Sequence, residues 1–172
     1  MNKPIYSVIA AATIDGRIAA HAWQFTGWTS KEDKDFLHKI LDQSDVVLVG
    51  NNTYKTAREP LSKRNCVVLT RSVRGVVLKR EGLVYLNPKN VNLKRYIKDK
   101  GFKRVVVLGG TQTFTYFLEK RMIDEIYLTI EPLVFGKGLN LFETKKSRIW
   151  NFKLVSVKRL NKKGSLLLHF KA

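Results

Sequence analysis

Short apolar runs and amphipathic stretches alternate along the chain. The apolar runs are rich in β-branched residues, as in strands covered on both faces; they span residues 5–12, 46–50, 66–70, 104–110 and 124–132. Other stretches place apolar side chains at the spacing of a helix with one buried face; they span residues 30–42, 51–57, 91–100 and 111–120. Two short strands are expected at 76–78 and 83–85, around a Glu-Gly turn.

The end of the chain has a different pattern. Two mixed apolar and polar stretches, residues 152–160 and 165–170, flank the turn residues 161–164 and predict a closing hairpin. Strands that alternate with helices are typical of an α/β fold with a parallel sheet. We therefore predict a single domain over residues 1–172, with a mostly parallel twisted sheet, flanking helices and a C-terminal antiparallel hairpin.

In such a sheet, ligands bind beyond the carboxyl ends of the parallel strands. Several of these ends are rich in glycine, asparagine and hydroxyl residues; the ends lie at residues 10–14, 50–53, 70–72, 109–113 and 129. The stretch LGGTQT at 108–113 runs from bare backbone into a helix start, which is an arrangement that binds anions. A guanidinium between two hydroxyls, TRS at 70–72, suits a phosphate monoester. NADPH, with a pyrophosphate and a separate phosphate, would use these loops together, although the full GxGxxG fingerprint is absent.

Asp33 stands out near the start of the predicted helix at 30–42, because it precedes apolar positions by three and four residues and so lies on the face that they bury. Two helix caps fit the sequence: Thr29 with Glu32, or Ser30 with Asp33. With the first cap, Glu32 is structural and Asp33 needs another partner, since a buried carboxylate is costly alone. With the second, Asp33 is itself structural.

Composition narrows the possible functions. The chain has 32 Lys and Arg against 14 acids, a net charge of +18 that favours anionic partners such as phosphorylated small molecules, nucleic acid or membrane surfaces. It lacks the apolar run of about 18 residues that a membrane span needs. Its single cysteine, Cys66, is typical of a reducing compartment, so we expect a cytoplasmic protein. Its three histidines are too scattered for a metal site, and no metal is predicted.

Five segments, in order over nearly the whole chain, resemble the dihydrofolate reductase family. They are YSVIAAATIDGRIA, WTSKEDKDFL, VGNNTYKT, PLSKRNCVVLTRS and the pair VVVLGGTQTFTYFL with DEIYLTIEP. The resemblance implies a dihydrofolate reductase-like fold and an enzyme that reduces 7,8-dihydrofolate to tetrahydrofolate with NADPH, in one-carbon metabolism.

The resemblance also implies roles for individual residues. Asp33 would grip the pterin and assist its protonation, Thr129 would support Asp33, and Trp28 would help to close the site. Arg64 would bind the carboxylate of the glutamyl tail. The implied substrate-binding set is Ile9, Ala10, Asp33, Leu37, Leu61, Arg64, Leu108, Phe114 and Thr129. The implied cofactor-binding set is Ala11, Ile18, Gly50, Asn51, Asn52, Thr53, Thr70, Arg71, Ser72, Leu108, Gly109, Gly110, Thr111, Gln112 and Thr113.

Two alternatives have support in the sequence. The segments TIDGRIA, SDVVLVGNNT and FGKGLNLF favour the related reductase domain of riboflavin biosynthesis, which would use NADPH on a phosphorylated pyrimidinone. We prefer dihydrofolate because Asp33 suits a pterin and Arg64 suits a glutamate tail. A basic nucleic-acid-binding module has only the charge and the aromatic residues among the lysines of 145–163 in its favour, without a recognisable motif. Either a monomer or a homodimer is compatible with the sequence.

Overall fold

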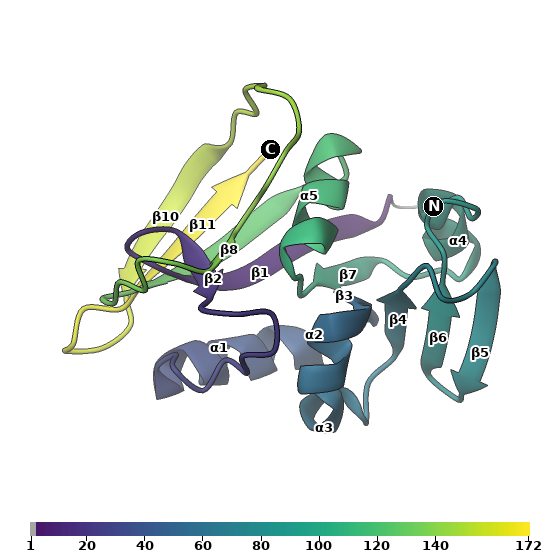
Figure 1. Cartoon of the computed structure of the whole chain (residues 1–172), viewed down its shortest axis with the longest axis horizontal. Helices are drawn as coiled ribbons and strands as arrows, with labels where there is room; N and C mark the ends of the chain where they lie inside the picture. Colours follow the sequence, from purple (N-terminus) through teal and green to yellow (C-terminus); the bar gives the residue numbers. More distant parts are fainter. Residues whose placement is uncertain (1–2) are drawn as a thin grey trace.

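The computed structural model describes residues 3–172, and a nine-stranded sheet runs through them (Figure 1). The strands of this sheet are β1 (Ile5–Thr13), β3 (Val46–Gly50), β4 (Cys66–Leu69), β5 (Val76–Arg80), β6 (Leu83–Leu86), β7 (Arg104–Val107), β8 (Glu125–Glu131), β10 (Lys153–Arg159) and β11 (Leu166–Lys171). The helices are α1 (Lys31–Asp42), α2 (Asn51–Thr56), α3 (Arg58–Leu61), α4 (Leu93–Asp99) and α5 (Thr111–Glu119). A separate two-stranded sheet pairs β2 (Arg17–Ala19) with β9 (Leu139–Asn140).

The sheet has a parallel centre and antiparallel edges. Its strand order is β10-β11-β8-β1-β7-β3-β4-β6-β5, and every neighbouring pair from β8 to β6 is parallel. The C-terminal hairpin of β10 and β11 continues the sheet beyond β8 in antiparallel fashion, and β5 does the same beyond β6. The predicted α/β fold with a C-terminal antiparallel hairpin is thus confirmed.

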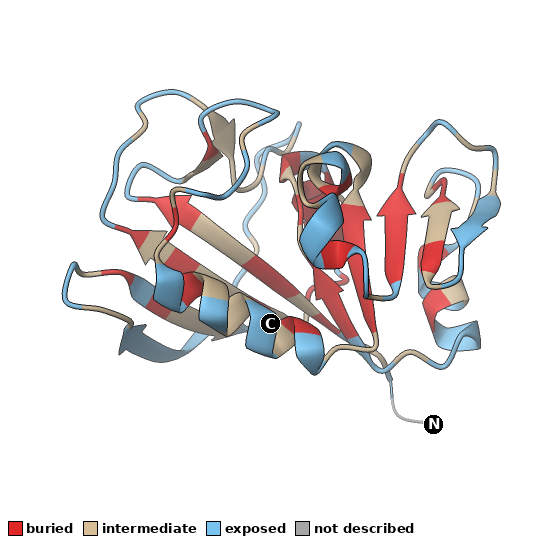
Figure 2. Cartoon of the chain, turned by 90° about the horizontal axis from the view of Figure 1, so that it is seen from below, coloured by how far each residue is buried: buried red, intermediate tan, exposed pale blue. Residues whose placement is uncertain are grey.

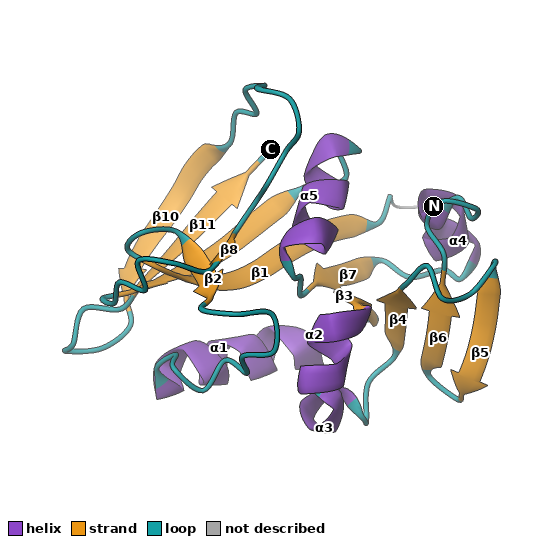
Figure 3. Cartoon of the chain, in the orientation of Figure 1, coloured by secondary structure: helices purple, strands orange, loops and turns teal. Residues whose placement is uncertain are grey.

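The central strands carry two cores because their side chains alternate between the two faces of the sheet. Val47 and Val49 belong to the core that contains residues of α1, α2 and α3, whereas Val46 and Leu48 belong to the core that contains residues of α4 and α5. Figure 3 shows these helices on the two sides of the sheet, and Figure 2 shows that the central strands are its most buried part. Continuous apolar runs therefore identified the right strands.

Several short elements escaped the sequence patterns. The predicted helix at 51–57 is α2, and a further short helix, α3, follows it without having been predicted. The predicted strand at 104–110 ends at Val107, before its glycine pair. Strands β2 and β9 are three and two residues long and were not predicted. They are too short to show a period of alternating residues. Within residues 3–172, none of the helices combines the length and the apolar character that a membrane crossing requires.

Asp15 joins the loop after β1 to the loop after β8. Its carboxylate accepts the backbone N–H groups of Phe135, at 3.2 Å, and Gly136, at 2.9 Å. The hydroxyl of Thr13 donates to the same carboxylate at 2.6 Å and is the main reason that the pKa of Asp15 lies below its usual value. This contact, together with the β2–β9 pair, holds the two loops in register.

Gly138 is required where β9 meets β2. Its φ of +142° is unfavourable for other residues, and a Cβ atom there would overlap with the carbonyl oxygen of Ala19. Gly138→Ala is expected to detach β9 and to lower the free energy of unfolding by about 1–3 kcal/mol, as overpacking does. Limited proteolysis should then cut the released loops faster. Gly136→Ala is the matched control, since Gly136 also has a positive φ but no atom within 4 Å of the added Cβ; equal sensitivity of both variants would contradict the steric argument.

Candidate active site

The carboxyl ends of the parallel strands come together as predicted. Ala11 of β1 pairs with Thr129 of β8, and Thr13 pairs with Glu131 at the end of the same two strands. On the other side of β1, the backbone N–H of Gly50 donates to the carbonyl oxygen of Gly109 at 2.8 Å and joins the ends of β3 and β7. The loops that carry the predicted ligand groups therefore follow neighbouring strands.

Helix α5 begins at this edge without a side-chain cap. Gly110 is its N-cap residue, so no side chain covers the first N–H groups of the helix. Helix α2 begins in the same way after Gly50. A side chain does not fit at Gly50 or Gly109: a Cβ atom would lie 2.7 Å from the hydroxyl oxygen of Thr113 or 2.6 Å from the ring of Phe114, respectively. The glycines allow the two loops to pack closely and leave the start of α5 open to an anion.

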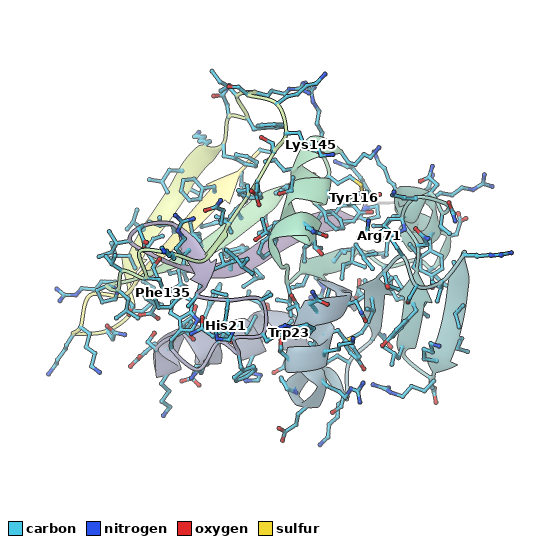
Figure 4. All side chains as sticks on the ribbon, viewed as in Figure 1. His21, Trp23, Arg71, Tyr116, Phe135 and Lys145 are labelled. Carbon is cyan, nitrogen blue, oxygen red and sulfur yellow. The ribbon has the colours of Figure 1, made fainter. Side chains whose placement is uncertain are left out.

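The side chains of the predicted cofactor loops differ in whether their polar groups already have partners within the protein. The hydroxyl of Thr111 donates to the carbonyl oxygen of Asn140, so only the backbone of Thr111 is available for a phosphate. After β4, the hydroxyls of Thr70 and Ser72 lie 3.0 Å apart and the N–H of Ser72 donates to Thr70. Arg71 between them is exposed beyond the carboxyl end of β4 (Figure 4), and it forms no ion pair within residues 3–172.

Ser30 caps α1, so the structure has the second of the two caps that fit the sequence and not the cap of Thr29 with Glu32. The hydroxyl of Ser30 accepts the backbone N–H of Asp33 at 3.3 Å, whereas the hydroxyl of Thr29 donates backwards to the carbonyl oxygen of Thr26. Asp33 does not complete the reciprocal cap, however. The backbone N–H of Ser30 donates instead to a carboxylate oxygen of Glu131, at 2.7 Å. The carboxylate of Asp33 therefore takes no part in the helix cap.

Asp33 is buried at the carboxyl edge beside Thr129. Its side chain is 8% exposed, and Thr129 is 1% exposed. Burial raises the pKa of Asp33, the nearby charge of Glu131 raises it further, and the neighbouring side chains of Thr129 and Thr29 offset part of the rise. A carboxyl group in such surroundings keeps its proton to higher pH than an exposed one, as a group that delivers a proton should.

The raised pKa of Asp33 gives a stability prediction. The folded state binds this proton more tightly than the unfolded state, so stability falls as pH rises from the ordinary pKa through the raised one. Asp33→Asn cannot ionise, so we expect it to gain stability relative to the natural chain, by about 1 kcal/mol at pH 8 and less at pH 4. Urea unfolding at both pH values measures the difference. Asp35→Asn changes an exposed acid of the same helix and should show no such trend; a matching trend would contradict the assignment to Asp33.

Comparison with known proteins identifies the family. A family model described as the RibD C-terminal domain matches residues 5–165. The chain belongs to this family.

Several known proteins are similar to this chain in sequence or in fold. The riboflavin biosynthesis protein RibD of Aquifex aeolicus (strain VF5) is 25% identical over 176 residues, and the match covers 81% of this chain and 49% of that protein. This chain thus spans about half the length of that relative. Acinetobacter baumannii RibD (form 1) has a TM-score of 0.78 at 19% identity, with 98% of this chain and 58% of that chain covered.

A third match is the Thermotoga maritima diaminohydroxyphosphoribosylaminopyrimidine deaminase/5-amino-6-(5-phosphoribosylamino)uracil reductase, with a TM-score of 0.75 at 20% identity, covering 98% of this chain and 56% of that chain. At these identities the two solved structures show the fold that this RibD family member shares with them.

The family corrects the preferred functional prediction. The assignment to dihydrofolate reductase is wrong, and so are dihydrofolate as substrate and a role in tetrahydrofolate and one-carbon metabolism. The alternative prediction, a reductase domain of riboflavin biosynthesis, agrees with the family that matches. Arg64 does not support dihydrofolate over the pyrimidine substrate, because its guanidinium lies 2.7 Å from the carboxylate of Asp42 at the end of α1. An arginine with a partner inside the protein does not indicate a glutamate-tailed substrate.

The apolar residues predicted for the pocket of this RibD domain are divided between the two faces of the sheet. Ile9 and Leu37 lie on the α1 face, as does Leu61, which is deeply buried there. Phe114 lies in the opposite core, against Phe142. Of the remaining predicted positions, Ala10 packs on the α5 face, Leu108 packs on the α1 face, and Ile18 belongs to β2.

Trp28 has an unpaired donor. Its ring packs edge-on against Phe135 at 5.1 Å between centroids, and its indole N–H is buried without an acceptor within residues 3–172. A buried N–H without a partner is costly, so this group suits an acceptor on a ligand. Figure 4 shows Phe135 on the segment after β8. No local pattern indicated this pairing, since the two residues are far apart in the chain.

Two hollows lie elsewhere on the surface. One, of about 440 Å³, is bordered by the start of α4 and by Tyr116 and Lys120; the other, of about 380 Å³, lies beside Tyr54 and Arg80. Neither is lined by Asp33, Thr129 or the glycines before α5. The described residues also contain no group of three or more His, Cys, Asp and Glu side chains that could hold a metal ion.

Proposed function

We propose that the chain reduces a phosphorylated ribosylaminopyrimidine with NADPH, as a reductase of riboflavin biosynthesis. The observation that carries this proposal is Asp33, a buried carboxyl group with a raised pKa at the carboxyl edge of a RibD-type fold. Support for the substrate class comes from the Thermotoga relative, whose name specifies 5-amino-6-(5-phosphoribosylamino)uracil reductase. The net charge of +18 suits a phosphorylated substrate and a phosphorylated cofactor.

The residues at the carboxyl edge fit NADPH. The uncapped start of α5, with the backbone of Gly110, Thr111 and Gln112, suits the pyrophosphate. Arg71 between two hydroxyls suits the 2′-phosphate. The unpaired indole N–H of Trp28 offers a donor to an acceptor such as a carboxamide oxygen. We propose that these residues, together with Asn52 and Thr53 at the start of α2, hold the cofactor.

The chemistry then requires one proton. NADPH, when bound, supplies a hydride. In a ribosylamino group, the sugar carbon bonded to nitrogen is the centre that accepts a hydride, and breaking its bond to the ring oxygen leaves a negative charge on that oxygen. Asp33 is the group proposed to donate the proton that neutralises this charge, and it regains its own proton from solvent. Thr129 lies beside the carboxyl group and is the residue proposed to orient it.

The test is NADPH oxidation by the purified chain with 5-amino-6-(5-phosphoribosylamino)uracil, its 2-amino precursor and dihydrofolate as separate substrates. Consumption of NADPH is expected with a pyrimidine and not with dihydrofolate. Formation of the ribityl product, followed by mass spectrometry, confirms where the hydride has gone. Absence of turnover with either pyrimidine, under conditions where NADPH binds, would overturn the proposed substrate.

A further inference from the structure

A second buried carboxylate lies beside Asp33. Glu131 ends β8, two residues after Thr129 on the same face of the strand, and it is 4% exposed. It forms no ion pair within residues 3–172. Its partners are neutral donors instead: the backbone N–H of Ser30, at 2.7 Å, and the hydroxyl of Ser165. Burying a carboxylate without a cation costs free energy, so we ask what Glu131 contributes to the site.

Glu131 belongs to a chain of hydrogen bonds that joins three parts of the fold. Ser165, in the turn between β10 and β11, is 1% exposed and donates its hydroxyl to Glu131. The side-chain amide of Asn161, in the same turn, donates to the hydroxyl of Ser165 at 2.9 Å and to the carboxylate of Glu32 at 3.2 Å. Both ends of this chain thus reach the first turn of α1, which carries Asp33.

The location of the turn explains how these distant residues meet. Figure 1 shows the loop between β10 and β11 extending from the edge of the sheet toward α1. The hairpin pairs with β8 in antiparallel fashion, so its turn lies at the carboxyl end of β8, where Glu131 is. The side chain of Glu131 therefore links the end of β8, the turn of the hairpin and the start of α1.

We propose that Glu131 is a positioning residue: by holding the backbone of Ser30, and by its own attachment to Ser165, it fixes the first turn of α1 and keeps Asp33 against Thr129. This inference rests on the proposed role of Asp33 in the reduction. The fold otherwise offers α1 only the Ser30 hydroxyl as a side-chain cap. A shift of about 1 Å in a group that must meet the substrate is enough to cost about a hundredfold in rate.

The charge of Glu131 has a second consequence for Asp33. Asp33 faces Glu131 from α1, and Lys34 on its own helix opposes the effect of Glu131. On the turn, Lys163 contributes to lowering the pKa of Glu32. Because Glu131 raises the pKa of Asp33, it extends the pH range in which Asp33 carries a proton.

Three variants separate the contacts from the charge. Glu131→Gln keeps an acceptor for Ser30 and a group for Ser165 but removes the charge. Glu131→Ala removes all of these, and Ser165→Ala removes only the attachment to the turn. Glu125→Gln is the matched control, since Glu125 is an acid at the other end of β8 with His169 and Lys171 as neighbours.

Two measurements need neither substrate nor cofactor. Amide hydrogen exchange reports the Ser30 N–H, and carboxyl NMR titration reports the pKa of Asp33. In Glu131→Ala, Ser30 exchange is expected to rise about tenfold or more. In Glu131→Gln, Ser30 stays protected while the pKa of Asp33 falls, and Glu125→Gln changes neither. If Glu131→Ala does not fold, Glu131→Gln and Ser165→Ala carry the test, the latter with a smaller rise in exchange.

Turnover completes the test. In Glu131→Ala, kcat is expected to fall about tenfold to a hundredfold with the NADPH Kd unchanged, and in Glu131→Gln the loss of activity at high pH should begin at lower pH. Unchanged Ser30 exchange and unchanged Asp33 titration in the Glu131 variants would overturn the inference. Absence of turnover in the natural chain would instead remove the proposed function, while the two substrate-free measurements still decide whether Glu131 holds Asp33.

Discussion

Asp33→Asn is expected to lower turnover of the pyrimidine substrate about 10²- to 10⁴-fold, which is the usual contribution of a positioned acid or base. Asparagine keeps the shape of the side chain and an acceptor oxygen beside Thr129, but it has no acidic proton to transfer to the substrate. Because Asp33 lies on α1 and the proposed pyrophosphate site lies at the start of α5, the Kd for NADPH should be unchanged. Stopped-flow turnover and NADPH titration by fluorescence measure the two quantities.

The pH dependence of turnover gives an independent check on Asp33. The carboxyl group acts in its protonated form, and burial raises its pKa, so kcat in the natural chain should fall as pH increases through that raised pKa. Asp33→Asn should lose this fall and keep a flat, low activity. Asp35→Asn, on the exposed side of α1, serves as the control and should behave as the natural chain does. Activity of Asp33→Asn close to that of the natural chain would remove Asp33 from the mechanism.

The fold could be predicted because its largest elements have strong patterns. The runs at 46–50 and 66–70 are apolar throughout because both faces of β3 and β4 are covered, and this is also why they could not be mistaken for edge strands. The hairpin at the end of the chain was recognisable from its turn residues. Strands β2 and β9 were missed because their existence depends on each other and on Asp15, which are contacts between distant segments.

The site could be predicted only in part. The strand ends indicated the glycines before α5 and the position of Thr129, because alternating strands and helices predict parallel strands, whose carboxyl ends lie at one edge of the sheet. The sequence could not decide between the two caps of α1, because the backbone N–H of Ser30 is bound by Glu131, which is 101 residues away. Glu131 itself precedes a proline at the end of a strand, where nothing in the local sequence indicates a buried carboxylate.

The choice of substrate failed for a physical reason as well. An arginine near a predicted site has several possible partners, and the sequence does not show that the carboxylate of Asp42 takes Arg64. Asp33 is compatible with any substrate that needs a proton, so it could not separate a pterin from a ribosylaminopyrimidine. The loops that would bind NADPH are expected in both kinds of reductase. The choice between the two substrates therefore depended on Arg64, whose partner is a carboxylate of the protein itself.

Arg71→Ala is expected to weaken NADPH binding by about 1.5–3 kcal/mol, or about 10- to 150-fold in Kd, and to leave NADH binding nearly unchanged. Arg71 is exposed beyond β4, between two hydroxyls that hydrogen bond to each other, and it has no carboxylate partner within residues 3–172. A guanidinium at this position suits the 2′-phosphate, which is the group that NADH lacks. Calorimetric titration with both cofactors measures the difference.

Lys98→Ala is the control for the overall charge. Lys98 is an exposed cation in the last turn of α4, away from the carboxyl edge, and its removal lowers the net charge by the same amount. If the charge of the whole protein attracted NADPH, both variants would weaken binding alike, and the weakening would vanish at high salt. Selective loss of NADPH affinity in Arg71→Ala locates the 2′-phosphate at the end of β4. Equal losses for NADPH and NADH would place Arg71 outside the phosphate site, because a contact with the 2′-phosphate cannot affect a cofactor that does not carry it.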